Sequence, residues 1–160
     1  MDRPRRNRHF SFDTTWSVDA PPDDVREVLV DLERYPQWWP QVRAVAKLGE
    51  DDAIVVCRAT LPYSLELRLH AVSRELPTLR VDVAGDLAGS VAWTLTEEGH
   101  GTRVDAHQEV ELRGVPAALV AATRPLLSWN HHRMMRGCAL GLDAQLSGRA
   151  GDRPLRRPGE

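Results

Sequence analysis

The feature that most constrains the fold of this chain is a long region, residues 42–112, in which apolar and polar residues alternate. Such alternation is typical of β-strands that bury one face and expose the other. In the clearest case, Leu65–His70, three leucines alternate with Glu, Arg and His. Short polar or Gly/Pro links between the segments favour antiparallel neighbours in a meander. The pattern predicts six strands, at Val42–Leu48, Ala53–Leu61, Ser64–Arg74, Thr78–Ala84, Leu87–Thr96 and Thr102–Leu112.

A seventh strand and two short helical segments are predicted before this region. Phe10–Val18 alternates in the same way and stops at the prolines that follow it. Pro22, with two acidic residues behind it, suits the first turn of a short helix that we expect at Val25–Leu32. Prolines bracket the segment Tyr35–Pro40, so we expect only a single turn there, with aromatic surface laid against the protein.

After residue 112 the apolar residues recur at helical spacing. Pro116 suits a first helical position, Pro125 is expected to kink or restart the helix, and the main segment should run from about Pro125 to Leu146. Only this helix is long enough to cover the apolar face of the sheet. One helix is too narrow to fill a strongly curved sheet, so either an aromatic plug or a cavity should remain. The predicted inward stripe consists of Leu127, His131, Met134 or Met135, Cys138, Leu142 and Leu146.

The length indicates one domain, and the order of the predicted strands and helices makes it an α+β domain. The 160 residues suffice for a single core. Residues 1–8 and 148–160 are polar, arginine-rich and interrupted by Pro and Gly, so we expect disordered tails around a domain at residues 9–147. The formal net charge of −2 gives no global field toward nucleic acid. No apolar run approaches the ~18 residues of a membrane span, and cytoplasm is the default location.

Metal, disulfide and cofactor chemistry are not expected. Cys57 and Cys138 lie far apart without a CxxC partner, which argues against a disulfide framework or a zinc knuckle. His131 and His132 are adjacent on a helix, so their rings point about 100° apart and cannot share an ion. No phosphate loop or dinucleotide fingerprint is present, and Gly85–Gly89 is interpreted as a bend or bulge in the sheet.

Three polar residues are candidates for chemistry beside a cavity. His131 could act as a general acid or base, and Asn130 could hold a ligand carbonyl. The interpretation we favour is that both form hydrogen bonds between the helix and the sheet. Arg58 would place a cation in the cavity, suited to an enolate or carboxylate, if its strand turns the even-numbered positions inward. The opposite parity, with Val55 and Cys57 inward, fits equally well and leaves Arg58 outside.

The chain has five tryptophans but only two phenylalanines and two tyrosines. Tryptophans can line a pocket for flat or polycyclic molecules or can pack the core. We favour core packing for Trp93 and Trp129. Trp38 and Trp39, in a short turn between prolines, are expected at a pocket rim or gate. Gln108 and Thr14 are inward polar residues that need hydrogen-bond partners if they are buried.

Several phrases of the sequence resemble one known family. They are Asp19–Val25, Asp31–Trp39, Leu61–Tyr63, Gly85–Gly89 leading to Trp93, Gly101–Val104, Trp129–His131, Met135 and Gly141–Leu142. Together they resemble the START-like superfamily in its polyketide cyclase/dehydrase-like (SRPBCC) branch, over nearly everything from Phe10 to Leu146. In one respect the chain departs from this family, whose members often carry an aromatic residue where this chain has Gln108.

The resemblance implies a helix-grip (START/Bet v 1-like) fold, in which a seven-stranded curved antiparallel sheet wraps around a long C-terminal helix with a cavity between them. The function it implies first is binding of an apolar or aromatic small molecule, such as a lipid, polyketide or isoprenoid. One alternative is a polyketide cyclase/aromatase-type enzyme, in which Arg58 or Asn130 would stabilise an enolate and His131 would move protons. Another is a protein-interaction or chaperone-cofactor module. The expected ligand-binding residues are Thr14, Trp16, Trp38, Trp39, Leu67, Trp93, Gln108, Asn130, His131, Met135 and Cys138.

Overall fold

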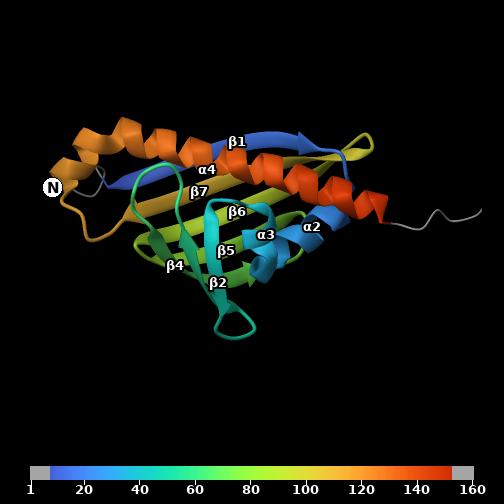
Figure 1. The fold of residues 1–160 in the computed structure, drawn as a ribbon, viewed down its shortest axis with the longest axis horizontal. Helices are drawn as coiled ribbons and strands as arrows, with labels where there is room; N and C mark the ends of the chain where they lie inside the picture. Colours follow the sequence, from blue (N-terminus) through green and yellow to red (C-terminus); the bar gives the residue numbers. More distant parts are fainter. Residues whose placement is uncertain (1–7, 153–160) are drawn as a thin grey trace, which may run out of the picture.

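The computed structural model describes residues 8–152, which form one curved sheet with a long helix lying across its inner face (Figure 1). This is the START/helix-grip architecture, as predicted. In chain order the elements are β1 (His9–Val18), α2 (Pro22–Val30), the 3₁₀-helix η1 (Leu32–Arg34), α3 (Tyr35–Trp38), β2 (Val42–Lys47), β3 (Asp52–Cys57), β4 (Leu65–Ser73), β5 (Thr78–Gly85), β6 (Leu87–Glu98), β7 (Gly101–Leu112) and α4 (Ala117–Gly151).

The seven strands form one antiparallel sheet in the order β1-β7-β6-β5-β4-β3-β2. Strands β2 to β7 are consecutive neighbours, and β1 pairs with β7 in the register Phe12 opposite Gln108. All seven predicted strands are confirmed, although β3 ends at Cys57 rather than at Leu61. Gly85 has φ +101°, and a Cβ there would approach the Glu66 carbonyl oxygen to 2.6 Å. A glycine at the turn from β5 to β6 therefore lets neighbouring backbones come close.

The short helices between β1 and β2 form as their prolines dictate. Helix α2 has Pro22 in its first turn, and it buries Val25, Val28 and Leu29 as one apolar face. Pro22 and the acidic residues form its first turn, as expected, and the helix ends at Val30 rather than at Leu32. The following aromatic segment is a single helical turn, α3, which confirms that its prolines prevent a longer helix.

Helix α4 begins earlier and ends later than predicted. It runs from Ala117 through Pro125 to Gly151 without interruption, so the expectation of a restart at Pro125 is wrong. The helix tolerates the missing amide of Pro125 because this first part is exposed on its outer side. The prediction of a disordered tail is wrong for residues 148–151, which belong to the helix. Residues 1–7 and 153–160 lie outside the described part of the chain.

The main hydrophobic core lies at the end of the sheet where α2, α3 and the second half of α4 meet. Buried residues of α4 at this end are Met135, Cys138, Leu142 and Leu146. A Cβ on Gly141 would collide with the Trp38 carbonyl oxygen, so the glycine allows α3 to pack directly on α4. A smaller cluster of Phe10, Val110 and Val120 lies toward the start of α4.

Candidate ligand-binding cavity

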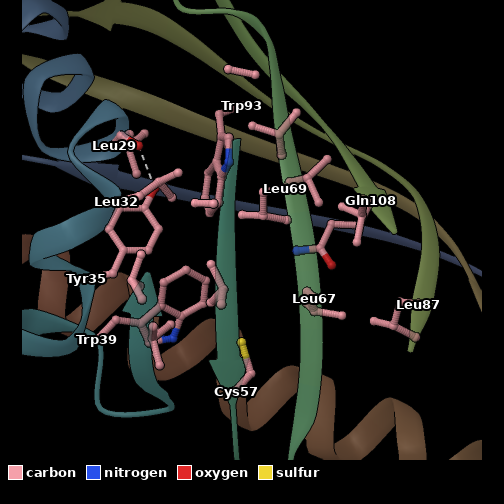
Figure 2. Close-up of a pocket in the computed structure, with 18 of the residues that line it drawn as sticks. Leu29, Leu32, Tyr35, Trp39, Cys57, Leu67, Leu69, Leu87, Trp93 and Gln108 are labelled. Carbon is pink, nitrogen blue, oxygen red and sulfur yellow. Dashed lines mark hydrogen bonds between the residues drawn. The ribbon is translucent and has the colours of Figure 1, made fainter. Parts of the chain in front are cut away.

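A cavity of about 510 Å³ lies between the inner face of the sheet and the helices. That size suits a small organic molecule. Figure 2 shows the side chains of its walls pointing toward one common space. Its interior is mainly aliphatic and aromatic, and the residues labelled there are Leu29, Leu32, Tyr35, Trp39, Cys57, Leu67, Leu69, Leu87, Trp93 and Gln108.

Aromatic side chains form one end of the cavity. Trp39 is 6% exposed and its indole N–H donates to the Met134 carbonyl oxygen at 3.0 Å, which fixes the ring against α4. The Tyr35 hydroxyl donates to the Leu29 carbonyl oxygen at 2.6 Å (Figure 2). Burial raises the pKa of Tyr35, so the phenol stays protonated and keeps this bond. The rings of Trp39 and Trp93 meet in an edge-to-face arrangement, with centroids 6.4 Å apart and planes at 84°.

A small polar cluster interrupts the apolar wall. Nε2 of His131 lies 2.9 Å from the side-chain oxygen of Gln108, whose amide nitrogen donates to the sulfur of Met135 at 3.4 Å. The His131 ring also stacks on Phe12, with centroids 3.7 Å apart and planes at 8°. This arrangement holds the amide and the imidazole side by side at the cavity wall.

The imidazole of His131 is neutral near pH 7. Burial lowers its pKa to about 4, and the neighbouring His132 adds to this effect. A neutral ring that donates from Nε2 leaves Nδ1 as an acceptor, and Nδ1 is buried without a partner among the described residues. The His131 to Gln108 contact joins α4 to β7, which agrees with the interpretation of a helix-to-sheet hydrogen bond.

Asn130 lines the cavity and also anchors a neighbouring loop. Its side-chain oxygen accepts from the backbone N–H groups of Thr60 and Leu61 at 3.0 and 3.1 Å. This pair of bonds ties the loop between β3 and β4 to α4 (Figure 1). Tyr63 of the same loop lines the cavity and is 39% exposed, so this loop borders one mouth of the cavity.

Arg58 lies outside the cavity. Strand β3 turns Val55 and Cys57 inward, and Arg58 follows the strand with an exposed side chain. Of the two parities that the sequence leaves open, the strand therefore has the one that keeps Arg58 out of the cavity. Cys57 takes that place in the wall, and burial raises the pKa of its thiol to about 12, so it is not a reactive thiolate near neutral pH.

The predicted ligand-binding residues divide into two groups. Trp39, Leu67, Trp93, Gln108, Asn130 and His131 line the cavity. Thr14, Trp16, Trp38, Met135 and Cys138 do not line it, and Met134 takes the place expected of Met135. Cys138 and Met135 are buried in the core, as is Trp38, because the cavity stops where α3 packs onto α4.

Two expectations about tryptophans are wrong. Trp38 and Trp39 are both 6% exposed, so neither forms a rim or gate. Trp129 does not pack in the core, because it lies on the outer side of α4, where it is 45% exposed. Trp93 is buried in the core, as expected, and also forms part of the cavity wall.

Sequence reasoning missed several wall residues. Leu69 repeats the alternation that had placed Leu67 inward, and Leu127 and Met134 share the inward stripe of the helix. Tyr63 lies in a loop, where no periodicity indicates a direction.

Charged lining residues gather at a second mouth, near η1 and the hairpin between β2 and β3. They include Asp31, Glu33, Glu50, Asp51 and Arg74. Arg74 pairs with the Asp51 carboxylate at 2.7 Å and donates to the Glu50 carbonyl oxygen. Within residues 8–152 no group of three or more His, Cys, Asp or Glu side chains is arranged to hold a metal ion. In the same part of the chain no helix has both the length and the apolar character of a membrane span.

The family model described as polyketide cyclase/dehydrase and lipid transport matches residues 9–145. The chain belongs to this family. Membership supports a hydrophobic ligand-binding or cyclase role. A search of curated protein sequences found no match.

Solved structures show the same fold at low sequence identity. TTHA0849 from Thermus thermophilus is 18% identical with a TM-score of 0.79, and the alignment covers 88% of this chain and 99% of that one. Zhui aromatase/cyclase from a Streptomyces species is 16% identical with a TM-score of 0.76, covering 89% and 96%. A START superfamily protein from Mycobacterium smegmatis is 15% identical with a TM-score of 0.69, covering 87% and 98%.

Proposed function

We propose that this protein binds an uncharged, largely apolar small molecule of the lipid, polyketide or isoprenoid kind in the cavity between its sheet and α4. The observation that carries the proposal is the lining: aliphatic and aromatic side chains enclose the interior, and the charged groups gather at one mouth. An ionised ligand inside would lose its hydration without a charged partner, which is costly. A neutral molecule avoids that cost and gains from leaving water.

The polar cluster supplies a point of recognition for such a ligand. Gln108 and His131 lie together in an otherwise apolar wall, and both line the cavity. Apolar walls alone do not fix the orientation of a ligand, whereas a single well-placed hydrogen bond does. Trp39 and Trp93 at the aromatic end offer flat surfaces, which favours ligands with a planar or ring-containing part.

A cyclase activity is the second candidate, and the family name favours it. In this reading the neutral imidazole of His131 would take up a proton from a ligand held near Gln108. A pKa of about 4 makes His131 a weak base at pH 7, so general base catalysis there would be inefficient. Arg58 is exposed and lies outside the cavity, so it is not placed to stabilise an enolate there. The Asn130 oxygen is committed to two backbone amides, which leaves only the side-chain NH2 group to donate to an enolate. Binding is therefore the better-supported function.

The test is to fill the cavity and measure binding of an uncharged aromatic probe. Leu67→Trp places a large ring in the interior, because Leu67 points inward on β4 (Figure 2). Val72→Trp is the matched control, since Val72 is 52% exposed on the same strand and does not line the cavity. We expect N-phenyl-1-naphthylamine to bind the natural chain and the control alike, and the Leu67→Trp variant at least tenfold more weakly. Equal affinity for both variants would show that the probe binds elsewhere.

Turnover separates the two candidates. If the protein only binds a poly-ketone, the compound should react at the same rate and give the same products with and without the protein. A cyclised product that disappears with His131→Gln, while probe binding persists, would favour the enzyme instead.

A further inference from the structure

Helix α4 is apolar on both sides, although only one side faces the sheet. Residues on its outer side recur at alternating spacings of three and four, which places them on one line along the helix. We call this line the outer stripe, and it consists of Leu119, Ala122, Leu126, Trp129, Arg133, Arg136 and Leu140. Its four large apolar members are 45–65% exposed. An outer helix face normally carries polar residues, so this stripe indicates a contact with something beyond the domain.

The charge of the stripe restricts what that contact can be. Residues 113–142 contain four arginines and no acidic residue, although the whole chain has a net charge of −2. Arg133 lies over the Trp129 ring at 5.8 Å, and Arg136 is exposed without an ion-pair partner among the described residues. A second copy of the chain would bring arginines together with no carboxylate in the stripe to neutralise them. The complementary partner is therefore an anionic surface.

The stripe also borders the mouth of the cavity. Leu126 and Trp129 on the outer side are direct neighbours of Leu127 and Asn130, which line the cavity. The loop that Asn130 holds adds the exposed Tyr63 and Arg58, again without an acidic residue between them. Exposed Trp, Tyr and Leu side chains next to arginines suit the interface of a bilayer, where the apolar parts insert and the guanidinium groups meet lipid phosphates.

We propose that the outer stripe of α4, together with the loop at residues 58–64, docks on the surface of an anionic lipid bilayer and brings this mouth of the cavity to the lipid. The stripe spans about 30 Å along the helix, enough for α4 to lie flat on the surface. The proposal does not depend on which ligand the cavity holds, and the test needs no ligand.

The test measures partition of the full chain onto vesicles of phosphatidylcholine, with and without one part in three of phosphatidylglycerol. We expect binding to the anionic vesicles and at least tenfold weaker binding to the neutral ones. Arg133→Gln with Arg136→Gln should weaken anionic binding at least tenfold. The control, Arg68→Gln with Arg103→Gln, removes the same charge from outward positions of β4 and β7 and should leave binding nearly unchanged. Equal loss in both pairs would mean that net charge alone acts, and would overturn the proposal.

Insertion of the stripe is measured separately with lipids brominated in their chains, which quench nearby tryptophans. We expect quenching of the natural chain and loss of most of it in Trp129→Phe, because Trp38, Trp39 and Trp93 are buried and Trp16 lies on β1, outside the stripe. Melting temperatures confirm that each variant is folded. The absence of quenching, or vesicle binding that no stripe substitution changes, contradicts the proposal. The proposal is also contradicted if substitutions in the stripe leave vesicle binding intact but abolish a dimer or a complex with an acidic protein.

Discussion

The two halves of α4 have different neighbours, although they belong to one continuous helix. From Met135 onward its inward residues are at most 5% exposed and pack against α2, α3 and the sheet. Between Leu127 and Met134 its inward residues Leu127, Asn130, His131 and Met134 are only half-buried, and they line the cavity. The second half therefore closes the core, and the first half covers a space.

The difference has a local cause in the sequence. Gly137 and Gly141 have no side chains, so the segment around α3 reaches the second half of the helix directly. Between the small cluster at Val120 and Met135, the helix faces only the sheet and the loop held by Asn130, and space remains beneath this part. Substitutions of inward residues in the second half should lower stability. Those in the first half should alter ligand binding, the anchoring of the loop or the pH dependence of the free energy of unfolding.

The largest effect is expected from Leu142→Ala in the second half. Leu142 is fully buried, and truncation of such a leucine costs about 2–5 kcal/mol. Leu140→Ala is the control, because Leu140 is 65% exposed and should change stability by less than about 0.5 kcal/mol. Denaturant unfolding measures both. A loss of similar size in the two variants would contradict the assignment of the core to the inward residues.

The next effect is a pH dependence from His131 in the first half. In the unfolded chain His131 has its ordinary pKa of 6.5, and in the folded chain burial lowers it to about 4. The unfolded state therefore binds more protons between these values, and the free energy of unfolding falls as the pH drops from 6.5 toward 4, by up to about 3 kcal/mol. His131→Gln should lack this part of the decline. Parallel curves for the two proteins would show that His131 is not buried in neutral form.

A smaller effect is expected at the loop that borders the mouth. Asn130→Ala removes the acceptor of two backbone amides, which should cost about 1–2 kcal/mol and speed hydrogen exchange at Thr60 and Leu61. Asn130→Asp keeps an oxygen acceptor and should preserve most of the protection. If exchange at these amides is the same in all three proteins, the loop is held by other contacts.

The smallest effect concerns the polar cluster. Gln108→Leu should weaken binding of 1-naphthol by about three- to tenfold, because one hydrogen bond to the ligand is lost. Naphthalene has no hydroxyl and serves as the matched ligand, with an affinity that should not fall. Calorimetric or fluorescence titration measures both. A parallel loss for the two ligands would mean that Gln108 acts only through the shape of the wall.

The fold could be predicted largely from the sequence because its signals are local. Alternation identified every strand, and the prolines limited α3 to one turn. The predicted α4 is too short because a proline inside a helix usually disrupts it. At Pro125 the missing hydrogen bond falls on an exposed part of the helix, and only the position of the helix in the fold shows this. Strand β3 was drawn too long, since the residues after Cys57 still alternate although the strand has ended.

The cavity residues were predicted less completely because they depend on contacts between distant elements. Gln108 and His131 were identified from inward positions, but their mutual hydrogen bond requires β7 to meet α4. Trp38 and Trp39 are adjacent in the sequence yet have different surroundings, one beneath Gly141 and one at the cavity wall. No periodicity distinguishes them, since the outcome depends on how a single turn packs.

Hydrogen exchange of the full chain, with and without saturating N-phenyl-1-naphthylamine, tests most directly whether the first half of α4 covers a ligand. The account predicts slower exchange at residues 127–134, at the loop of residues 58–64 and along β4, with little change at residues 138–146, which are already protected by the core. Uniform slowing along all of α4, or no change at residues 127–134, would contradict it.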